Sequence, residues 1–412
     1  MDAWPSPALP AVPGHGVAPL VYDSASDALV AAEPAGETAT LYVCGITPYD
    51  ATHLGHAATY LAFDTLQRVW RDAGYAVRYA QNITDVDDPL LERAARDGVD
   101  WQALAAAEID GFRSDMAALG IIPPDAYVAV TERIEPTAVA VAELLANGLA
   151  YRATADDASD DSDGFDVYFD TTAAADVSPW RLGQESRLTP DEMLPIFAER
   201  GGDPTRVGKR NELDPLLWRA ARPGEPSWDS PVGRGRPGWH IECAVIALNE
   251  LGETVTVLGG GSDLLFPHHE FSAANASALT GEPAARVYAH SGMVAYRGEK
   301  MSKSLGNLVK VSELRAAGVD PRALRLALLA HHYRDDWEWT DASLPTALER
   351  LRRWRAAPSA PGEYAALAEL REALHHDLDT PAALAVVDAA VEAGGLSPEL
   401  RSGIHLLLGI EL

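Results

Sequence analysis

The sequence contains very little cysteine, with only Cys44 and Cys243 among its 412 residues. Two thiols cannot build the disulfide framework of a small secreted domain, and their scarcity fits a reducing cytoplasm. The count alone leaves one structural bridge between them open. What these residues do must therefore be judged from the segments around them.

Long apolar runs are also absent. No stretch approaches the roughly 20 apolar residues that cross a bilayer, and the N-terminus has no charged segment followed by an apolar core, so no export signal is evident. At 47% hydrophobic residues the chain can still bury a large core. We expect a soluble cytoplasmic protein of several domains, without internal repeats or a membrane partner.

Positive charge is in short supply, because 33 Lys plus Arg stand against 61 Asp plus Glu and give a net charge of −28. Proteins that grip a long phosphate backbone normally present clustered cations, and this chain has no such cluster. The total charge does not exclude a local patch. It nevertheless argues against a nucleic-acid partner.

The pattern of strands and helices predicts an α/β fold with a Rossmann-like body, interrupted by an insertion and followed by short helices. The acidic run 156–163 is most simply a solvated loop, because its charges repel one another, and we assign it no calcium. Trp337, Glu338 and Trp339 are most simply a packing cluster between domains. We divide the chain into an arm at 1–35, a first catalytic half at 36–150, an insertion at 151–236, a second catalytic half at 237–296, a loop with connecting helices at 297–341 and a helical bundle at 342–412.

The segment 44–56 combines a thiol with a His-x-Gly-His turn. It follows the apolar run 39–43 and precedes an amphipathic stretch, so a strand should pass through a loop into a helix. Free N–H groups at a helix N-terminus favour anions, and the imidazoles of His53 and His56 can donate to phosphate oxygens. Gly55 would let a nucleotide approach the backbone. Two histidines near a turn are, alternatively, ordinary surface residues.

A second motif strengthens the interpretation of the first as a nucleotide-binding loop. Lys300-Met301-Ser302-Lys303-Ser304 together with the His-x-Gly-His turn resembles the "KMSKS" and "HIGH" loops of class I aminoacyl-tRNA synthetases. The resemblance implies a Rossmann-like class I synthetase catalytic domain that forms an adenylate from ATP with Mg²⁺, with His53, His56, Lys300 and Lys303 as catalytic groups. Two ammonium groups suit the β- and γ-phosphates, whose charge grows as pyrophosphate leaves. Taken alone, the two lysines would be a solvated basic loop.

A third element is the glycine-rich segment 256–264, where a strand should enter a turn that ends in Asp263. In a doubly wound nucleotide fold such a turn packs adenosine on backbone while an acid binds ribose hydroxyls. Glycine-rich turns are common in proteins. Gly261 and Asp263 gain meaning only from the two motifs above.

The segments around the two cysteines resemble the zinc-binding segments of cysteinyl-tRNA synthetase. Cys243 ends Gly-Trp-His-Ile-Glu-Cys, and His268 lies in Phe-Pro-His-His-Glu. Matched residue by residue, the resemblance assigns Cys44, Cys243 and His268 as ligands of one zinc ion. That synthetase places a glutamate ligand where this chain has Ser272. The alternative is that both cysteines pack in the core while His268 satisfies a backbone carbonyl.

Three protein ligands would leave a tetrahedral zinc ion with an open position, as expected where a substrate coordinates directly. A cysteine substrate would fill it as thiolate, whereas serine offers a poor ligand, so selection needs no editing site. Zinc would then be a selectivity device. Mg²⁺ would enter with ATP.

Several features resemble the mycothiol-pathway ligases that join cysteine to glucosaminyl-inositol. They are the segments 199–204 and 45–49, the missing glutamate ligand, and an end at Leu412 without a further anticodon-reading module. The segment Glu-Arg-Gly-Gly-Asp-Pro could also be a plain turn. The resemblance implies that L-cysteine, ATP and glucosaminyl-inositol are the partners of a monomer. A minimal cysteinyl-tRNA synthetase is the alternative, and a catalytically silent binding protein is a distant third.

The resemblance implies two substitutions at one site. The cysteine carboxylate attacks the α-phosphorus of ATP, and the acceptor amine then attacks the acyl carbon of the adenylate. Asp263 and Thr84 are candidates for contacting the amine, and Trp239 would close the cysteine pocket, although a Trp before a helix is more often core packing. The other residues assigned to substrate binding are Cys44, Gly45, Ile46, Thr47, Thr59, Asn82, Ile83, Gly261, Ser262 and Val294.

Overall fold

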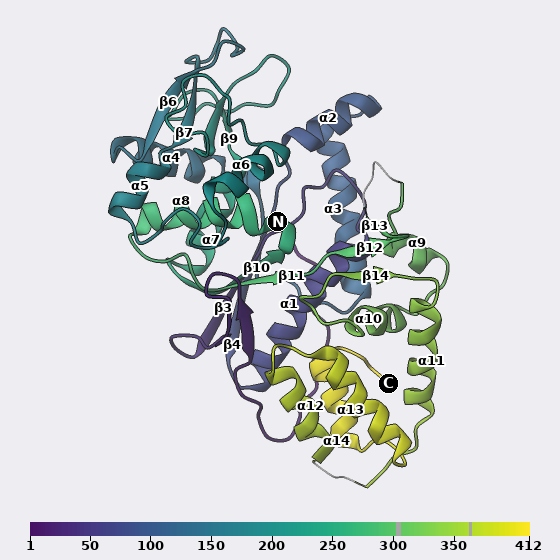
Figure 1. Ribbon diagram of the computed structural model, residues 1–412. Coiled ribbons are helices and arrows are strands. Elements are labelled where there is room, and N and C mark those ends of the chain that lie inside the picture. Colours follow the sequence, from purple (N-terminus) through teal and green to yellow (C-terminus); the bar gives the residue numbers. More distant parts are fainter. Residues whose placement is uncertain (302–305, 362–364) are drawn as a thin grey trace.

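The computed structural model describes residues 1–301, 306–361 and 365–412, except for the side chain of Lys300 (Figure 1). Its central sheet has five strands, all parallel, in the order β11-β10-β3-β4-β5. β3, the first of these strands in the sequence, lies in the middle of the sheet. β4 and β5, which follow it in the sequence, lie on one side of it, and β10 and β11, from far along the chain, lie on the other. The strands are β3 (Thr38–Val43), β4 (Ala76–Ile83), β5 (Ala126–Ala129), β10 (Val255–Gly261) and β11 (Ala285–Ser291).

The strand order therefore reverses between β3 and β10, and in doubly wound sheets ligands bind beyond the carboxyl ends of the strands at such a point. Cys44 directly follows β3, and Gly261 ends β10. The backbone N–H of Cys44 donates to the carbonyl oxygen of Gly259 at 3.1 Å, which holds the two strand ends together. The α/β expectation is confirmed, and the His-x-Gly-His loop and the glycine-rich segment meet at one edge of the sheet.

Helices cover both faces of the sheet, as crossover connections between parallel strands require. The crossovers are α1 (Leu54–Asp72), α2 (Asp88–Asp97), α3 (Trp101–Ala118), α4 (Ile134–Ala146), α7 (Trp239–Leu251) and α8 (Glu270–Thr280).

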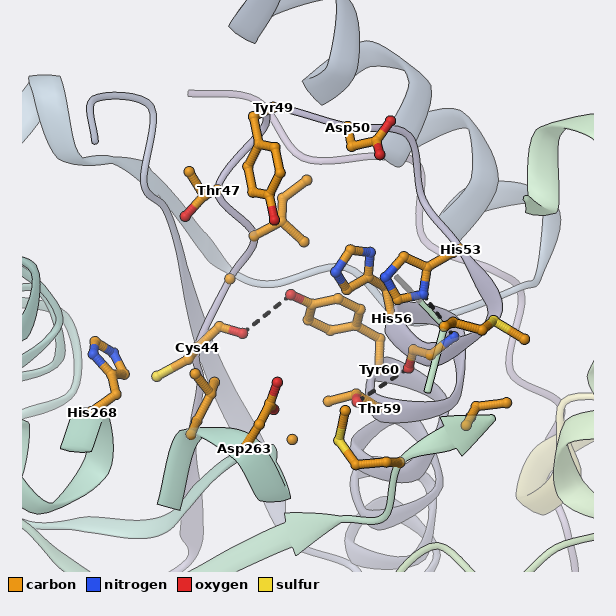
Figure 2. A pocket seen from close by; sticks show the side chains of 18 of the residues that line it. Cys44, Thr47, Tyr49, Asp50, His53, His56, Thr59, Tyr60, Asp263 and His268 are labelled. Atoms are coloured by element: carbon orange, nitrogen blue, oxygen red, sulfur yellow. Dashed lines mark hydrogen bonds between the residues drawn. The ribbon is translucent and has the colours of Figure 1, made fainter. Parts of the chain in front are cut away.

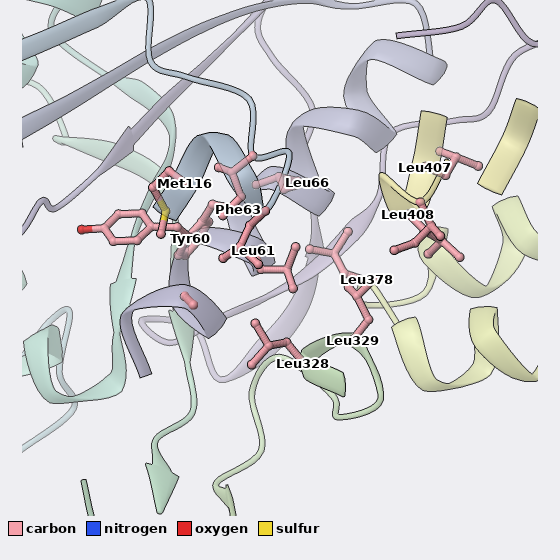
Figure 3. Close-up of a cluster of buried hydrophobic side chains, with 14 of the residues drawn as sticks. Tyr60, Leu61, Phe63, Leu66, Met116, Leu328, Leu329, Leu378, Leu407 and Leu408 are labelled. Carbon is pink, nitrogen blue, oxygen red and sulfur yellow. The ribbon is translucent and has the colours of Figure 1, made fainter. Parts of the chain in front are cut away.

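The longest of these helices, α1, is buried along most of its length and packs on apolar side chains from α3, α10 (Pro321–Leu329) and the C-terminal segment (Figure 3). A buried charge network adds to this contact. Asp64 accepts from Arg68 at 2.7 Å and from Arg325 of α10. Arg325 in turn donates to the carbonyl oxygen of Leu408 at 2.6 Å. The C-terminal region is thereby tied to the helix that begins at the His-x-Gly-His turn.

An antiparallel sheet of four strands lies apart from the central one (Figure 1). It is accompanied by α5 (Thr171–Val177) and α6 (Pro190–Glu199). Two acids of the run expected to be a solvated loop are paired, because Asp157 contacts Arg222 and Asp161 contacts Arg234, each at 2.9 Å. The pairing offsets part of the repulsion within the run. The strands are β6 (Ala150–Thr154), β7 (Phe165–Phe169), β8 (Leu216–Ala220) and β9 (Gly235–Pro237).

The first 35 residues pack on the body more closely than an arm rich in proline and alanine suggests. They contain the hairpin β1 (Leu20–Asp23) and β2 (Ala28–Ala31). Trp4 is buried, and its indole N–H donates to the carbonyl oxygen of Ile121 at 2.8 Å. One aromatic anchor was the signal that the expectation overlooked.

After the central sheet the chain forms a small three-stranded sheet and then helices. The segment expected to be a packing cluster is a strand, β14, which pairs in parallel with β12. In the described part of the chain, no helix is long and apolar enough to span a membrane. The elements are β12 (Val294–Tyr296), β13 (Glu299–Lys300), α9 (Val311–Ala316), α10, β14 (Trp337–Trp339), α11 (Ser343–Ala356), α12 (Ala365–His375), α13 (Thr380–Glu392) and α14 (Pro398–Gly403).

Candidate active site

A cavity of about 400 Å³ opens beyond the carboxyl ends of β3 and β10, beside the N-terminus of α1. Figure 2 shows Cys44 and His268 on one side of it and His53 and His56 on the other. Most of the residues assigned from the sequence line this cavity, although they come from distant parts of the chain. They are Cys44, Gly45, Ile46, Thr47, His53, His56, Thr59, Asn82, Trp239, Gly261, Asp263, His268 and Val294.

Four assigned residues do not line the cavity. Ile83 and Thr84 are buried, and Thr84 lies beside Asn82, whose amide N–H donates to its hydroxyl at 3.0 Å. Ser262 and Cys243 are likewise outside the lining, although Cys243 lies next to Cys44. Lys303 and the side chain of Lys300 lie outside the described residues, so their assignments stay predictions.

The metal side of the cavity consists of the three predicted ligands. Cys44, Cys243 and His268 each offer one ligand atom, and these atoms all lie within 4.8 Å of one another. All three side chains are buried, and Nε2 of His268 is 3.2 Å from Sγ of Cys243. Two sulfurs and one imidazole nitrogen form a soft donor set that suits zinc. The residues present therefore fit a metal ion.

The pKa values of the two thiols are shifted in opposite directions. Burial and a hydrogen bond to Cys243 raise the pKa of the Cys44 thiol well above its ordinary value. Burial also opposes the thiolate of Cys243, but hydrogen bonds from Cys44 and His268 and the nearby imidazole hold its pKa well below its ordinary value. One thiolate is therefore favoured before any cation binds, and a cation would favour the second.

Further imidazoles surround the ligands. His240 faces His268, with the two Nδ1 atoms 3.2 Å apart, and Nε2 of His269 is 3.2 Å from Sγ of Cys44. His269 is held in turn by His290 at 2.8 Å. Such outer contacts fix the orientation of metal ligands. Sequence reasoning missed these three histidines, although His240 and His269 occur in the two segments already quoted for the ligands.

The position of the absent glutamate ligand is one turn beyond His268. Ser272 there donates from its hydroxyl to the carbonyl oxygen of His240 at 3.1 Å. Among the described residues, the group of possible ligands contains no carboxylate. Trp239 stacks on the other face of His268, with ring centroids 4.2 Å apart. This stack favours the predicted place of Trp239 in the cavity wall over simple core packing.

The nucleotide side begins with the His-x-Gly-His turn. His53 caps α1, and its Nδ1 accepts the backbone N–H of Gly55 at 3.1 Å, so the ring carries its proton on Nε2. A Cβ on Gly55 would lie 2.8 Å from Cε1 of His53. Glycine is thus required for the histidine ring to fold back, which is a different reason from the nucleotide approach expected from the sequence.

His56 stacks on His53 with ring centroids 3.9 Å apart. Its Nδ1 is sealed from solvent and has no hydrogen-bond partner among the described residues. Burial lowers the pKa of His56 to about 4, so the ring is neutral near pH 7. His56 lines the cavity, where a neutral imidazole can bind a polar group of a ligand.

The glycine-rich segment differs from the expected turn, since β10 continues through Gly261. A Cβ on Gly259 would lie 2.3 Å from the Phe63 ring of α1, so that glycine serves the packing of helix on sheet. A Cβ on Gly261 would lie 2.6 Å from Oδ1 of Asp263. The missing Cβ lets the Asp263 carboxylate lie over the strand end, at the cavity wall.

The contacts of Asn82 indicate a structural task. Its Oδ1 accepts the backbone N–H of Gly45 at 2.8 Å and the hydroxyl of Tyr42 at 3.2 Å, while its Nδ2 donates to Thr84. The amide is therefore occupied by protein groups. Asn82 fixes the loop that begins at Cys44.

Other lining residues were absent from the sequence assignment. Tyr49 and Asp50 lie on the loop before the histidines, and Tyr60 donates from its hydroxyl to the carbonyl oxygen of Cys44 at 3.1 Å (Figure 2). Tyr49 and Asp50 belong to the quoted motif and could have been included. Tyr60 could have been found only from the helical spacing that puts it one turn after His56.

The parallel sheet, the His-x-Gly-His turn and the cavity at the switch point define a class I aminoacyl-tRNA synthetase catalytic fold. Solved structures of this class are similar to the chain. Methionyl-tRNA synthetase of Mycobacterium tuberculosis in complex with methionyl-adenylate has a TM-score of 0.60 and 19% identity over 87% of this chain and 82% of that one. A putative arginyl tRNA synthetase from Campylobacter jejuni has a TM-score of 0.55 and 13% identity, covering 91% and 93%. At these identities the likeness shows the fold alone.

Sequence relatives specify the family. The family model for the class I (C) tRNA synthetase catalytic domain matches residues 31–349. The L-cysteine:1D-myo-inositol 2-amino-2-deoxy-α-D-glucopyranoside ligase of Clavibacter michiganensis is 59% identical over all of this chain and 99% of that protein. The ligase of the same name from Streptomyces scabiei is 55% identical over all of both chains. The chain belongs to this family of ligases, and the predicted fold class and resemblance are confirmed.

Proposed function

We propose that the protein ligates L-cysteine to the amine of glucosaminyl-inositol, with ATP converted to AMP and pyrophosphate through a cysteinyl-adenylate intermediate. One observation carries the proposal. Two members of the buried trio, Cys44 and His268, line the same cavity as the paired histidines at the start of α1, and Cys243 lies directly behind them. The relatives named as this ligase match the chain along its full length, which supports the choice of substrates.

We propose that Cys44, Cys243 and His268 hold one zinc ion. When bound, zinc would supply a Lewis acid with room for a further soft ligand, and so would favour a thiol substrate over a hydroxyl one. The position equivalent to a fourth protein ligand carries the hydroxyl of Ser272, which is turned to a backbone carbonyl. This arrangement supports an open position. Trp239 would cover the bound cysteine, because its ring already lies on His268.

In the first step a carboxylate oxygen of cysteine attacks the α-phosphorus of ATP, the bond to the β-phosphate oxygen breaks, and pyrophosphate leaves with Mg²⁺. His53 would donate from Nε2 to phosphate oxygens, since its Nδ1 is committed to Gly55. Neutral His56 would add a second donor without a competing proton equilibrium near pH 7. We assign the ammonium groups of Lys300 and Lys303 to the leaving phosphates, on the sequence motif alone.

In the second step the acceptor amine attacks the acyl carbon, an amide bond forms, and the bond to the AMP phosphate oxygen breaks. The amine must lose a proton, and a carboxylate on the cavity wall could first attract its cationic form. Of the two residues suggested from the sequence, Asp263 lines the cavity whereas Thr84 lies outside it beside Asn82. We therefore retain Asp263 for this contact, or for the ribose hydroxyls of ATP.

A minimal cysteinyl-tRNA synthetase would share the first step and differ in the acceptor. The net charge of −28 opposes a grip on a long phosphate backbone and favours the small acceptor. We also propose that the enzyme acts as a monomer in the cytoplasm, where ATP is available and both cysteines stay reduced.

The experiment that separates the two acceptors offers preformed cysteinyl adenylate, with the purified protein, either glucosaminyl-inositol or tRNA. We expect cysteine to appear on the amine of the sugar, detected by mass spectrometry, and none on tRNA. Transfer to tRNA without transfer to the sugar would establish the alternative. ATP–pyrophosphate exchange that depends on cysteine is the control for the shared first step, and a silent binding protein would lack it.

A further inference from the structure

The segment Glu-Arg-Gly-Gly-Asp-Pro, at 199–204, has no part in the two steps above, yet its turn has a defined geometry. Helix α6 ends at Glu199, and Gly201 follows with a φ of +86°, a conformation that favours glycine. A Cβ on Gly202 would lie 2.5 Å from the ring of Phe197, so the turn packs directly on the helix that it ends.

The far side of this turn is anchored in the inserted sheet. Asp203 accepts the hydroxyl of Tyr168 on β7 and the ammonium of Lys209 at 3.0 Å. The side chain of Lys209 is buried and lies over the rings of Tyr168 and Phe197. These contacts hold the turn against β7 and α6, and Arg200 projects from it.

Arg200 points out of the insertion and toward the candidate active site. Its Nη1 donates to the carbonyl oxygen of Asp263 and, at 2.5 Å, to that of Phe266. Asp263 lines the cavity, and His268 of the metal side follows two residues after Phe266. One guanidinium nitrogen thus contacts a short stretch that joins a residue on the nucleotide side, Asp263, to a predicted metal ligand, His268.

This stretch needs an outside donor. Ser262–Leu264 and Leu265–His269 form two short helical turns, and the second is interrupted at Phe266, which is extended with φ −136° and ψ 136°. An interrupted helix leaves carbonyl groups without intrahelical partners. Arg200 supplies a charged donor to two of them, and hydrogen bonds to charged groups are stronger than neutral ones.

We infer that Arg200 is a positioning residue that sets the segment 263–268, and through it both Asp263 and His268, so that the insertion acts on the nucleotide side and the metal side together. The consequence for catalysis rests on the proposed function. The consequence for metal binding needs only the proposed metal site of Cys44, Cys243 and His268, whichever reaction the protein catalyses.

The test compares Arg200→Ala with Arg206→Ala in the full-length protein. Arg206 is a matched control, since it is also partly buried and donates to one backbone carbonyl, that of Thr154, and to Asp166, both within the insertion. Arg200→Lys keeps the charge and can bond one carbonyl. Cobalt(II) serves as the metal probe, because its absorption reports the thiolate and imidazole ligands directly.

We expect Arg200→Ala to bind cobalt at least ~10-fold more weakly than the wild type, in line with the loss of contacts that orient metal ligands, and to raise the KM for ATP about 10-fold in pyrophosphate exchange. Arg206→Ala should leave both values within about twofold even if its Tm falls, and Arg200→Lys should recover part of both. Equal losses in the two alanine variants, or wild-type values in Arg200→Ala, would overturn the inference. A wild-type protein without cysteine-dependent exchange would instead refute the proposed function, and the cobalt measurement would still decide the role of Arg200.

Discussion

The two sides of the cavity are built in different ways. On the metal side the three predicted ligands are buried and come from the end of β3, from α7 and from the segment before α8, and Cys44 and His268 each contact a further ring. On the nucleotide side both histidines come from one turn at the start of α1 and are only half-buried. Under the proposed function, selection of the amino acid would depend on the packed interior of the fold, whereas phosphate binding would depend on the end of one helix.

This difference has consequences for substitutions. Removal of a metal ligand leaves buried polar groups unsatisfied and takes away the binding site of a whole ion, so the effect should be nearly complete. Removal of a phosphate donor leaves the rest of the site in place and should reduce the rate by a limited factor. The following changes test that contrast, from the largest expected effect to the smallest.

Replacement of Cys243 with alanine should have the largest effect. We expect zinc content, measured by atomic absorption, to fall from one per chain to near zero, and cysteine-dependent pyrophosphate exchange to fall at least ~1,000-fold, because two ligands rarely hold the ion. The control is Ser272→Ala, which changes a neighbour outside the ligand set and should keep its zinc. Full exchange activity in Cys243→Ala would remove the metal from the account.

Replacement of His56 with glutamine should lower kcat of the exchange reaction roughly 100-fold, the usual cost of one lost donor to a developing charge, while zinc content stays unchanged. The pKa of about 4 keeps His56 neutral, so its contribution should not titrate near neutrality. The ratio of wild-type to variant kcat should then be constant from pH 5.5 to pH 8. A ratio that falls as the pH is lowered through about 6.5 would show instead that His56 has the pKa of an ordinary, exposed histidine.

Substitution of Trp239 tests the metal side while all three predicted ligands stay in place. Replacement with alanine removes the ring that stacks on His268 and should raise the KM for cysteine about 10-fold, while replacement with phenylalanine should keep most of the affinity. The KM for ATP is the internal control and should stay within about twofold. Equal rises in both KM values would mean that the substitution disturbs the whole cavity.

Substitution of Thr59 should have the smallest effect, and it tests whether this residue serves the nucleotide side or the metal side of the cavity. Its hydroxyl is 2.8 Å from that of Ser291 and also donates to the carbonyl oxygen of Gly55. Thr59→Val loses about 1 kcal/mol of hydrogen bonding, so we expect the KM for ATP to rise ~5-fold and the KM for cysteine to stay constant. A rise confined to the KM for cysteine would place Thr59 against the amino acid instead of the nucleotide.

The sequence allowed the fold to be predicted where patterns are local. The apolar run of β3, the amphipathic α1 and the helices of the C-terminal region have a periodicity that a single chain displays. The strand β14 was missed because its partner, β12, lies far away in the sequence, and the hairpin β1 and β2 was missed although its two short strands pair with each other. Short strands of this kind carry little signal of their own.

The candidate site shows the same limit. Motif residues such as His53 and Cys44 could be assigned, since their types and spacing match known chemistry. The reasons for the glycines could not, because Gly55 and Gly261 are required by the rings and carboxylates that fold over them. The donors to the Asp263 and Phe266 carbonyls come from Arg200, more than 60 residues earlier in the chain. Such contacts exist only after the insertion is placed in space.

The most direct test of the central claim replaces zinc with cobalt(II) in the wild-type protein and follows its absorption as amino acids are added. If the trio of Cys44, Cys243 and His268 leaves one position for the substrate, cysteine should strengthen the thiolate-to-cobalt charge-transfer band by about half, as three sulfurs replace two, and serine should leave it unchanged. An identical spectrum with cysteine and with serine would contradict the account.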